Sequence, residues 1–439
     1  MFTFIPEPRL LDSPRRRPGL APRPLPAYVA GGLPARAQVV VIGTGPAGIA
    51  VAGALWHAGV HDLVLLDPAE RPCARFLDRV DAIGQRVLRS PYEHHPGVEG
   101  HRDCELLDFA RLHWAELTQT ERGEIRMAQS GHRSVVPLDV FEAYASHVAE
   151  IHDVPQRAWQ ATVRQTMPRG PGVDDEVDVV TDRGVLTARH VVLCLGEERR
   201  TAPSSWWAER PASVRYWDEP EQAQPTGRGS TSTASNGRTV VVGAGLTAAH
   251  VLTEALEHGR DVAWVMRAAQ ETYKCADVDA TFFRPEGRAT FARSTAEERV
   301  ELTNRHRHAS VMFEFRPLLN AAEADGRMIV HRNVDVTAVE AGRVRLSDGR
   351  SVHGDEIVLC LGTHARPGGG VLGAEFVGPG MWGDLDPRTL AYVRAPQVHA
   401  VGAAAGGVLG PAARNIDGHR VAAERIVRAV RADAAVVHG

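Results

Sequence analysis

The chain of 439 residues contains short runs of consecutive apolar residues that end in glycine. Residues 39–42 lead to Gly43, residues 240–242 lead to Gly243, and a stretch with the apolar spacing of a helix follows each glycine. Uninterrupted apolar runs of this length are typical of strands buried on both faces of a parallel sheet. Their alternation with helical stretches predicts the α/β fold class.

The apolar pattern also repeats over a longer distance. Residues 190–195 and residues 356–361 each form a buried-strand pattern that ends in Leu-Cys-Leu-Gly, at Gly196 and Gly362. Stretches of alternating apolar and polar residues precede both, within 161–188 and 328–346, and predict small β-meanders. A repeat of this kind indicates a duplicated unit.

Two more elements are predicted outside the repeat. Residues 397–401 form another buried strand that ends at Gly402, and a helical pattern follows over 412–429. A helix is also predicted over 138–150, with Asp139 as its N-cap.

The turns after the first two strands carry a recognisable motif. The first is Gly43-Thr-Gly45-Pro46-Ala47-Gly48, and the second is Gly243-Ala-Gly245-Leu246-Thr247-Ala248. In such a turn the first glycine allows the tight bend, the second lets a pyrophosphate approach the backbone, and the third position needs a small residue for helix–strand packing. Each motif, taken alone, could also be an ordinary strand–helix turn. Two copies in the correct context predict two dinucleotide cofactors, and therefore electron transfer between them.

The residues at the ends of the following strands distinguish the two sites. Asp67 ends the strand after the first motif, where an acidic residue binds a ribose hydroxyl. Arg267 ends the strand after the second motif, where an arginine can pair with a 2′-phosphate. The second site is therefore predicted to bind NADP rather than NAD.

Composition excludes several other classes of protein. The formal net charge of −4 offers no basic field for nucleic acid, and no apolar run is long enough to span a membrane. The N-terminus lacks the pattern of a secretory signal, so a cytoplasmic protein is expected. The five cysteines form no C-x-x-C pair, and neither a redox disulfide nor a metal site is expected.

Several residues are candidates for contact with a substrate. A polar segment between two prolines contains Tyr92, His94 and His95, which could bind a carboxylate or could equally be hydrogen-bonded residues of a structural loop. Lys274 is the only lysine of the chain and lies shortly after Arg267, although a solvated surface lysine is the more common case. Near the N-terminus, Arg15–Arg17 are interpreted as a solvated charge run rather than a phosphate contact.

Together these motifs resemble the flavoproteins with two dinucleotide-binding domains. The resemblance implies two Rossmann-like domains, with a discontinuous FAD domain and an NADP domain inserted into it. The expected parts are a Pro/Arg-rich arm at 1–35, FAD-binding segments at 36–204 and 355–439, and an NADPH-binding domain at 205–354 with a flexible loop at 219–237. It also implies that Arg89, Gly196, Gly402 and Asn415 belong to the FAD site and Gly362 to the NADP site.

Within this fold the chain is most similar to the flavin-dependent N-hydroxylating monooxygenases, which include the lysine and ornithine hydroxylases. The match lies in residues 136–144, 213–216 and 357–363. The chain departs from the family at positions that bind the substrate: the family's lysine falls on His94, and its asparagine–glutamate motif is replaced by residues 283–287. A simple lysine or ornithine substrate is therefore not expected.

The resemblance implies an oxidoreductase that uses FAD, NADPH and O2 to hydroxylate a small primary amine through a C4a-hydroperoxyflavin. A role in a biosynthetic pathway and a homo-oligomeric state are compatible with it. It assigns no catalytic residue beyond the cofactors. Two alternatives stay open. One is oxygen insertion into sulfur or carbon, although the motif that marks those relatives is missing. The other is an NADPH-dependent flavin reductase that inserts no oxygen.

Overall fold

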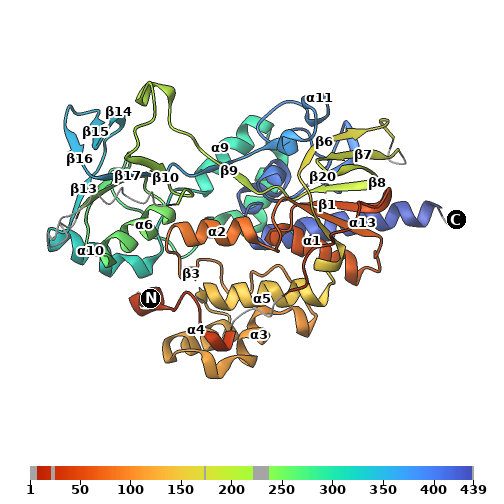
Figure 1. Cartoon of the computed structure of the whole chain (residues 1–439), viewed down its shortest axis with the longest axis horizontal. Helices are drawn as coiled ribbons and strands as arrows, with labels where there is room; N and C mark the ends of the chain where they lie inside the picture. Colours follow the sequence, from red (N-terminus) through yellow and green to blue (C-terminus); the bar gives the residue numbers. More distant parts are fainter. Residues whose placement is uncertain (1–6, 21–24, 173–174, 221–236, 438–439) are drawn as a thin grey trace.

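The computed structural model describes residues 7–20, 25–172, 175–220 and 237–437. Two parallel sheets form the centres of two domains that lie side by side (Figure 1). The predicted α/β class with two Rossmann-like domains is thus confirmed. Most of the expected loop at 219–237 lies outside the described residues.

The first domain is built on a sheet of eight strands in the order β19-β20-β8-β1-β2-β5, in which β7 also pairs with β8 and β6 pairs with β7. Strand β8 runs through both parts: its first half pairs antiparallel with β7, and its second half lies parallel to β1. The predicted meander therefore leads directly into the central sheet. The strands are β1 (Arg36–Ile42), β2 (Leu63–Asp67), β5 (Ala158–Gln160), β6 (Val163–Pro168), β7 (Val177–Thr181), β8 (Gly184–Leu193), β19 (Ala391–Tyr392) and β20 (Ala395–Ala400).

The second domain has five parallel strands in the order β10-β17-β11-β12-β13. They are β10 (Val214–Tyr216), β11 (Arg238–Val242), β12 (Asp261–Val265), β13 (Met328–His331) and β17 (Glu356–Leu359). The predicted boundary at residue 355 requires correction. Strand β17 lies between β10 and β11, so the second domain extends to about Gly362 and the first domain resumes after it.

Smaller strand pairs complete the architecture. A meander of β14 (Val336–Glu340), β15 (Arg343–Leu346) and β16 (Ser351–His353) belongs to the second domain. Strands β3 (Val87–Leu88) and β4 (Val136–Pro137) pair in the first domain. The two domains are joined by β9 (Glu197–Arg199) and β18 (Thr363–Ala365), which pair antiparallel and directly follow the two Leu-Cys-Leu-Gly endings.

Helices cover the sheets and form a separate layer beneath the first domain (Figure 1). Among the described residues no helix combines the length and the apolar character needed to cross a membrane. The helices are α1 (Pro46–His57), α2 (Ala74–Ala82), α3 (Leu106–Leu112), α4 (Gln119–Gln129), α5 (Leu138–Ile151), α6 (Leu246–Glu257), α7 (Ala280–Phe283), α8 (Pro285–Arg293), α9 (Ala296–His306), α10 (Arg316–Ala324), α11 (Ala374–Val377), α12 (Gly406–Leu409) and α13 (Ile416–Val437).

Two predicted helix starts differ from the structure. Helix α5 begins after Pro137, and Asp139 lies in its first turn instead of capping it. Helix α13 begins at Ile416 and not at 412, because Gly410 has a φ of 73° and separates two short turns before the helix.

The N-terminal arm is packed against both domains. Leu10 and Leu11 are buried in a cluster that includes Leu319 and other residues of the second domain. Arg17 is only 8% exposed, and its guanidinium binds Glu121 at 2.7 Å and Asp139 at 2.6 Å. The solvated interpretation of Arg17 is therefore wrong, because two buried carboxylates on α4 and α5 surround it.

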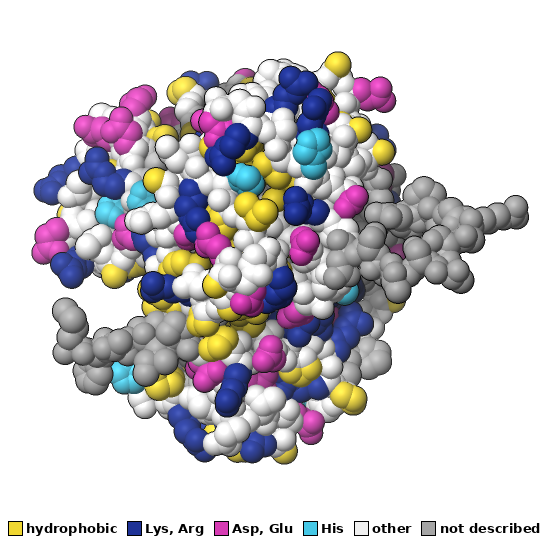
Figure 2. All heavy atoms as spheres, turned by 90° about the vertical axis from the view of Figure 1, so that its left-hand side faces the viewer, with side chains coloured by type: hydrophobic (Ala, Val, Ile, Leu, Met, Phe, Trp, Pro, Cys, Tyr) yellow, Lys and Arg dark blue, Asp and Glu magenta, His cyan; other side chains and the backbone are white. Residues whose placement is uncertain are grey.

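The face of the second domain carries mixed charge. Figure 2 shows basic and acidic side chains interspersed over this side of the molecule, with single hydrophobic side chains between them. This distribution is consistent with the small net charge of −4.

Replacing Arg17 with methionine should destabilise the protein strongly. The change leaves two buried carboxylates without their counter-charge, and breaking a buried pair in this way costs about 3–5 kcal/mol. Arg15→Met is the matched control, because Arg15 pairs with Asp81 at the surface and such pairs contribute about 1 kcal/mol or less. Urea unfolding measures the stability of both variants. An equal shift of the urea midpoint in Arg17→Met and Arg15→Met would contradict the structural role of Arg17.

Candidate functional site

The first glycine turn connects β1 to α1 and is closed on one side and open on the other. Gly43 has a φ of 104°, and a Cβ there would lie 2.4 Å from the carbonyl oxygen of Cys194. A Cβ on Gly48 would lie 1.9 Å from the carbonyl oxygen of Gly43. A Cβ on Gly45 would meet nothing within 4 Å. The turn therefore packs against its own sheet and leaves its middle glycine free, as a bound pyrophosphate requires.

The helix start and the acidic residue complete this turn. Gly45 is the N-cap residue of α1, and Pro46 and Ala47 begin the helix, so free N–H groups face the open side. Asp67 ends β2, where its carboxylate accepts hydrogen bonds from the backbone N–H of Thr44 at 2.7 Å and that of Ala69 at 2.8 Å. These bonds hold Asp67 beside the turn, where a ribose hydroxyl would lie. The site fits an adenine dinucleotide.

The second turn, between β11 and α6, repeats this geometry. Gly243 has a φ of 138°, and a Cβ there would lie 2.3 Å from the carbonyl oxygen of Cys360. Ala248 is fully buried, whereas a Cβ on Gly245 would meet its first neighbour, Ala309, only at 4.0 Å. Gly245 is the N-cap residue of α6, which Leu246 and Thr247 begin. This turn therefore fits a second dinucleotide.

Arg267 lies where the sequence predicts a contact with the 2′-phosphate of NADP. It follows β12, and its side chain is 87% exposed, with the nearest carboxylate, that of Asp335, at 3.9 Å. A weakly held arginine at this edge of the sheet is available for a 2′-phosphate.

Three further glycines lie where strands end at the centre of the molecule. Gly196 and Gly362 have φ values of 67° and 81°, and a Cβ on either would meet nothing within 4 Å. Gly402 follows β20 with a φ of 74°, and His419 of α13 lies behind it. All three predicted positions are therefore left-handed, and the first two are open.

An interdomain cluster of charged residues lies at the junction of the two domains. Asp277 binds Arg89 at 2.5 Å and Arg307 at 2.8 Å, and Arg307 also donates to the amide oxygen of Asn415 at 2.9 Å. Arg414 contacts Glu197 and Thr363. The interdomain cluster thus joins β3, the segment after β12, α9, β9, β18 and the start of α13.

The interdomain cluster carries more positive than negative charge. Its three arginines, Arg89, Arg307 and Arg414, face two carboxylates, Asp277 and Glu197. Burial by itself would raise the pKa of Asp277, but the three arginines outweigh burial and hold that pKa below its usual range. Burial and the neighbouring Arg414 lower the pKa of Arg307 to about 10, so it is still charged at neutral pH.

One donor of the interdomain cluster has no partner. The Nε atom of Arg89 is buried and, among the described residues, makes no hydrogen bond. An unpaired buried donor costs about 1–3 kcal/mol, which favours a ligand at this position. The interdomain cluster is therefore suited to an anionic group.

The predicted substrate residues divide into two groups. Lys274 borders the interdomain cluster, because its carbonyl oxygen accepts a hydrogen bond from Arg89 at 2.8 Å while its ammonium group binds Asp279 at 2.5 Å. His94 is half-buried. Tyr92 and His95 are 0% and 1% exposed.

The burial of Tyr92 and His95 favours the second of their two interpretations, that of residues in a structural loop. Tyr92 packs within the hydrophobic core of the first domain. His95 is held between Glu105 at 2.8 Å and the hydroxyl of Tyr144 at 3.1 Å. Both side chains stabilise the loop between β3 and α3 and have no exposed surface with which to meet a ligand.

Sequence reasoning missed most of the interdomain cluster. Glu197 and Thr363 directly follow the two Leu-Cys-Leu-Gly glycines, and this position could have marked them. Arg414 stands next to the predicted Asn415. Asp277 and Arg307 lie outside any motif, and only the folded chain brings them together.

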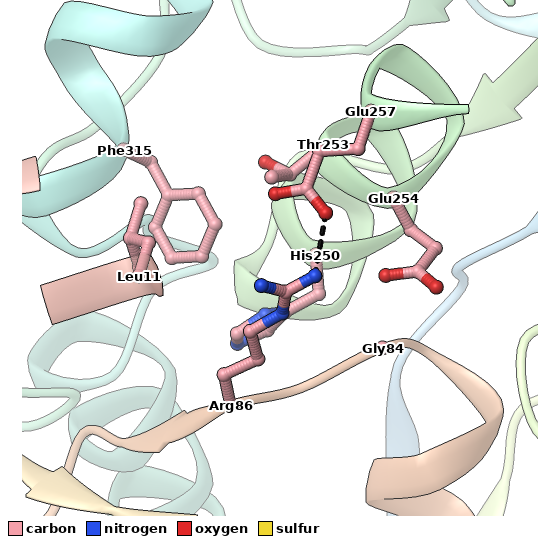
Figure 3. Close-up of a pocket in the computed structure, with 8 residues that line it drawn as sticks. All are labelled: Leu11, Gly84, Arg86, His250, Thr253, Glu254, Glu257 and Phe315. Atoms are coloured by element: carbon pink, nitrogen blue, oxygen red, sulfur yellow. Dashed lines mark hydrogen bonds and ion pairs between the residues drawn. The ribbon is translucent and has the colours of Figure 1, made fainter. Parts of the chain in front are cut away.

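A small hollow beside α6 is separate from both turns. Figure 3 shows Arg86 and Leu11 facing His250 and Thr253, with an ion pair between Arg86 and Glu257. Its volume of about 10 Å³ is close to that needed by one water molecule. The Nε2 atom of His250 and the hydroxyl of Thr253 have no partner among the described residues, so a water would satisfy both.

Comparison with known proteins agrees with this geometry. The family model described as pyridine nucleotide-disulphide oxidoreductase matches residues 37–425. The chain belongs to this family. It is therefore an oxidoreductase, and the expected flavoprotein architecture with two dinucleotide-binding domains is confirmed. No curated protein matches the sequence.

Solved structures share the fold over nearly their whole length. An ornithine N-hydroxylase from Kutzneria sp. 744, in complex with reduced FAD, NADP+ and L-ornithine, has a TM-score of 0.68 at 18% identity and covers 91% of this chain and 99% of its own. An L-lysine 6-monooxygenase from Pseudomonas syringae has a TM-score of 0.65 at 18% identity and covers 90% of this chain and 99% of its own. A cadaverine monooxygenase from Erwinia amylovora, bound to FAD, has a TM-score of 0.68 at 14% identity and covers 90% of this chain and 94% of its own. These similarities, together with the family, support FAD and NADP as the cofactors.

Replacing Gly48 with alanine should abolish flavin binding. The new Cβ would collide with the carbonyl oxygen of Gly43 and displace the turn that faces the pyrophosphate. Gly123→Ala in α4 is the control, because a Cβ there would meet nothing within 4 Å. The absorbance spectrum of the purified variants measures bound FAD. A yellow Gly48→Ala protein with full FAD content would contradict the assignment of this turn.

Replacing Arg267 with alanine should weaken NADPH but leave NADH nearly unchanged. A charge-assisted hydrogen bond is worth about 1.5–3 kcal/mol, which corresponds to a rise of about 10- to 100-fold in the KM for NADPH. Arg327→Ala is the control, because Arg327 precedes β13 and so lies at the opposite edge of the same sheet. Steady-state kinetics with NADPH and with NADH measure the ratio of the two KM values for each variant. An equal loss for both would contradict the role of Arg267.

Proposed function

We propose that the protein is an NADPH- and O2-dependent FAD monooxygenase that hydroxylates the nitrogen of a small primary amine carrying a carboxylate. The observation that carries this proposal is the interdomain cluster, where an excess of half-buried positive charge meets the ends of both dinucleotide-binding units. The three similar structures are of ornithine, lysine and cadaverine enzymes, all of which act on amines.

The chain's own residues supply binding and electrostatics. With both cofactors bound, the nicotinamide would supply hydride to the flavin, and the reduced flavin would activate O2. The two glycine turns orient the cofactors from opposite domains. The residues of the interdomain cluster are half-buried between the two domains. Such a reaction needs a site closed to water, because water would divert activated oxygen to hydrogen peroxide.

The excess positive charge serves the amine in two ways. Arginine donors such as the free Nε of Arg89 bind the carboxylate of the substrate. The same charge disfavours an ammonium ion nearby and so lowers the pKa of the bound amine. A neutral amine is the form that can attack oxygen as a nucleophile.

A thiol–disulfide reaction is the less suitable alternative within this family. The sequence contains no C-x-x-C pair. Cys194 and Cys360 are buried, and burial raises the pKa of both thiols. Since the thiolate is the reactive form, these positions do not suit disulfide reduction.

The decisive experiment measures where the oxygen goes. Purified protein with FAD is supplied with NADPH and a panel of amines, and hydroxylated amine and hydrogen peroxide are quantified together. The proposal expects amine-dependent NADPH oxidation with hydroxylamine as the main product. Stoichiometric hydrogen peroxide with every amine would indicate a flavin reductase, and an oxygenated sulfur or carbon compound would indicate another monooxygenase.

Replacing Arg89 with glutamine should raise the KM of a carboxylate-bearing amine. Loss of one charged contact predicts a rise of about 10- to 100-fold. Arg86→Gln is the matched control, because Arg86 pairs with Glu257 outside the interdomain cluster. An amine that lacks the carboxylate should not distinguish the variant from the wild type. If Arg89→Gln instead loses FAD, Arg89 belongs to the flavin site, as the sequence predicts.

A further inference from the structure

Three potential metal ligands converge at the end of α1 that lies away from the glycine turn. They are His57 in the last turn of α1, Cys104 before α3, and His152 directly after α5. Their ligand atoms all lie within 4.8 Å of one another. The three residues are called the His–Cys–His cluster below. We propose that it binds one Zn²⁺ ion.

The distances fit a tetrahedral ion. The Sγ atom of Cys104 lies 3.7 Å from the Nε2 atom of His57 and 3.7 Å from that of His152. In a tetrahedral zinc site, bonds of about 2.3 Å to sulfur and about 2.0 Å to nitrogen place these ligand atoms about 3.5 Å apart. Both sulfur–nitrogen separations therefore match two edges of the coordination tetrahedron.

The surroundings of the His–Cys–His cluster orient its ligands. The Nδ1 atom of His152 donates to the carbonyl oxygen of Val148 at 2.7 Å, which leaves the lone pair of Nε2 directed at Cys104. A ring N–H held by a carbonyl is the usual outer partner of a metal-binding histidine. Burial raises the pKa of the Cys104 thiol, and the backbone N–H of Val98, which donates to its sulfur, offsets part of this effect.

The His–Cys–His cluster also has room for its ligands and a route by which an ion can enter from solvent. A Cβ on Gly53 would lie 3.1 Å from the ring of His152, so this glycine leaves room for the imidazole. His57 is exposed, whereas Cys104 and His152 are buried, which gives an ion a route from solvent. The ring of His101 lies against that of His57, with centroids 3.8 Å apart and the planes tilted by 37°. A water can complete the coordination at this open side.

Binding would release one proton and form bonds to three segments of the chain. Zn²⁺ displaces the thiol proton of Cys104 to solvent and accepts lone pairs from the thiolate and from two neutral imidazoles. The ion thereby cross-links the end of α1, the end of α5 and the loop before α3; α5 runs beneath α1 in Figure 1. A helix of 12 residues places His57 about 16 Å along its axis from Pro46. The site is therefore structural and does not take part in the redox chemistry.

Metal analysis and cobalt spectroscopy of the full-length protein test this proposal. The protein is stripped with a chelator, dialysed, and titrated with Zn²⁺ or Co²⁺. The expected result is one ion per chain, a thiolate-to-cobalt charge-transfer band, and a higher melting temperature with Zn²⁺. Cys104→Ser should remove the band and the thermal increment, while Cys275→Ser and His61→Gln should retain both.

His57→Gln keeps the test decisive if the buried variants fail to fold, because His57 is exposed at a helix end. This variant should fold and bind Zn²⁺ more weakly than the wild type. Absence of stoichiometric Zn²⁺, or equal binding by the wild type and Cys104→Ser, would overturn the proposal. The sequence-based expectation of no metal site would then stand.

Discussion

The contact between a strand carbonyl and the first glycine of each turn is the constraint on which the rest of the structure depends. The carbonyl of Cys194 lies against Gly43, and that of Cys360 lies against Gly243, at distances that no side chain could tolerate. In both domains the cysteine N–H also bonds to the residue that precedes the glycine, Ile42 or Val242. The repeated Leu-Cys-Leu-Gly ending is thus explained: each copy closes the back of one dinucleotide turn.

These two contacts also determine where the interdomain cluster lies. Each closing strand continues through a left-handed glycine into β9 or β18, and these two strands pair with each other. Glu197 and Thr363 are the first residues of these two strands, and the hydroxyl of Thr363 donates to the carboxylate of Glu197 at 3.0 Å. The charged side chains of the inserted segment then meet them there. The two glycine turns and the interdomain cluster are consequently parts of one arrangement.

Local patterns were sufficient for the parts of the molecule that depend on neighbours in sequence. The turns at Gly43 and Gly243, Asp67 and Arg267 follow from spacing alone, because a strand, a turn and a helix in direct succession define their positions. Contacts between distant segments could not be predicted in this way. Arg17 looked like part of a solvated run because its partners, Glu121 and Asp139, lie far along the chain. Tyr92 looked like a ligand contact for the same reason, since the core that surrounds it comes from other helices.

The single lysine has a practical consequence. Lys274 is the only side chain of the sequence with a primary amine, and it lies beside the site proposed for the substrate. Its side chain is 25% exposed, and its ammonium group binds Asp279. A reagent that acylates amines has therefore one internal target, and the mass of one peptide reports the extent of labelling. Protection of that peptide serves as a direct indicator of occupancy for a protein whose substrate is still to be identified.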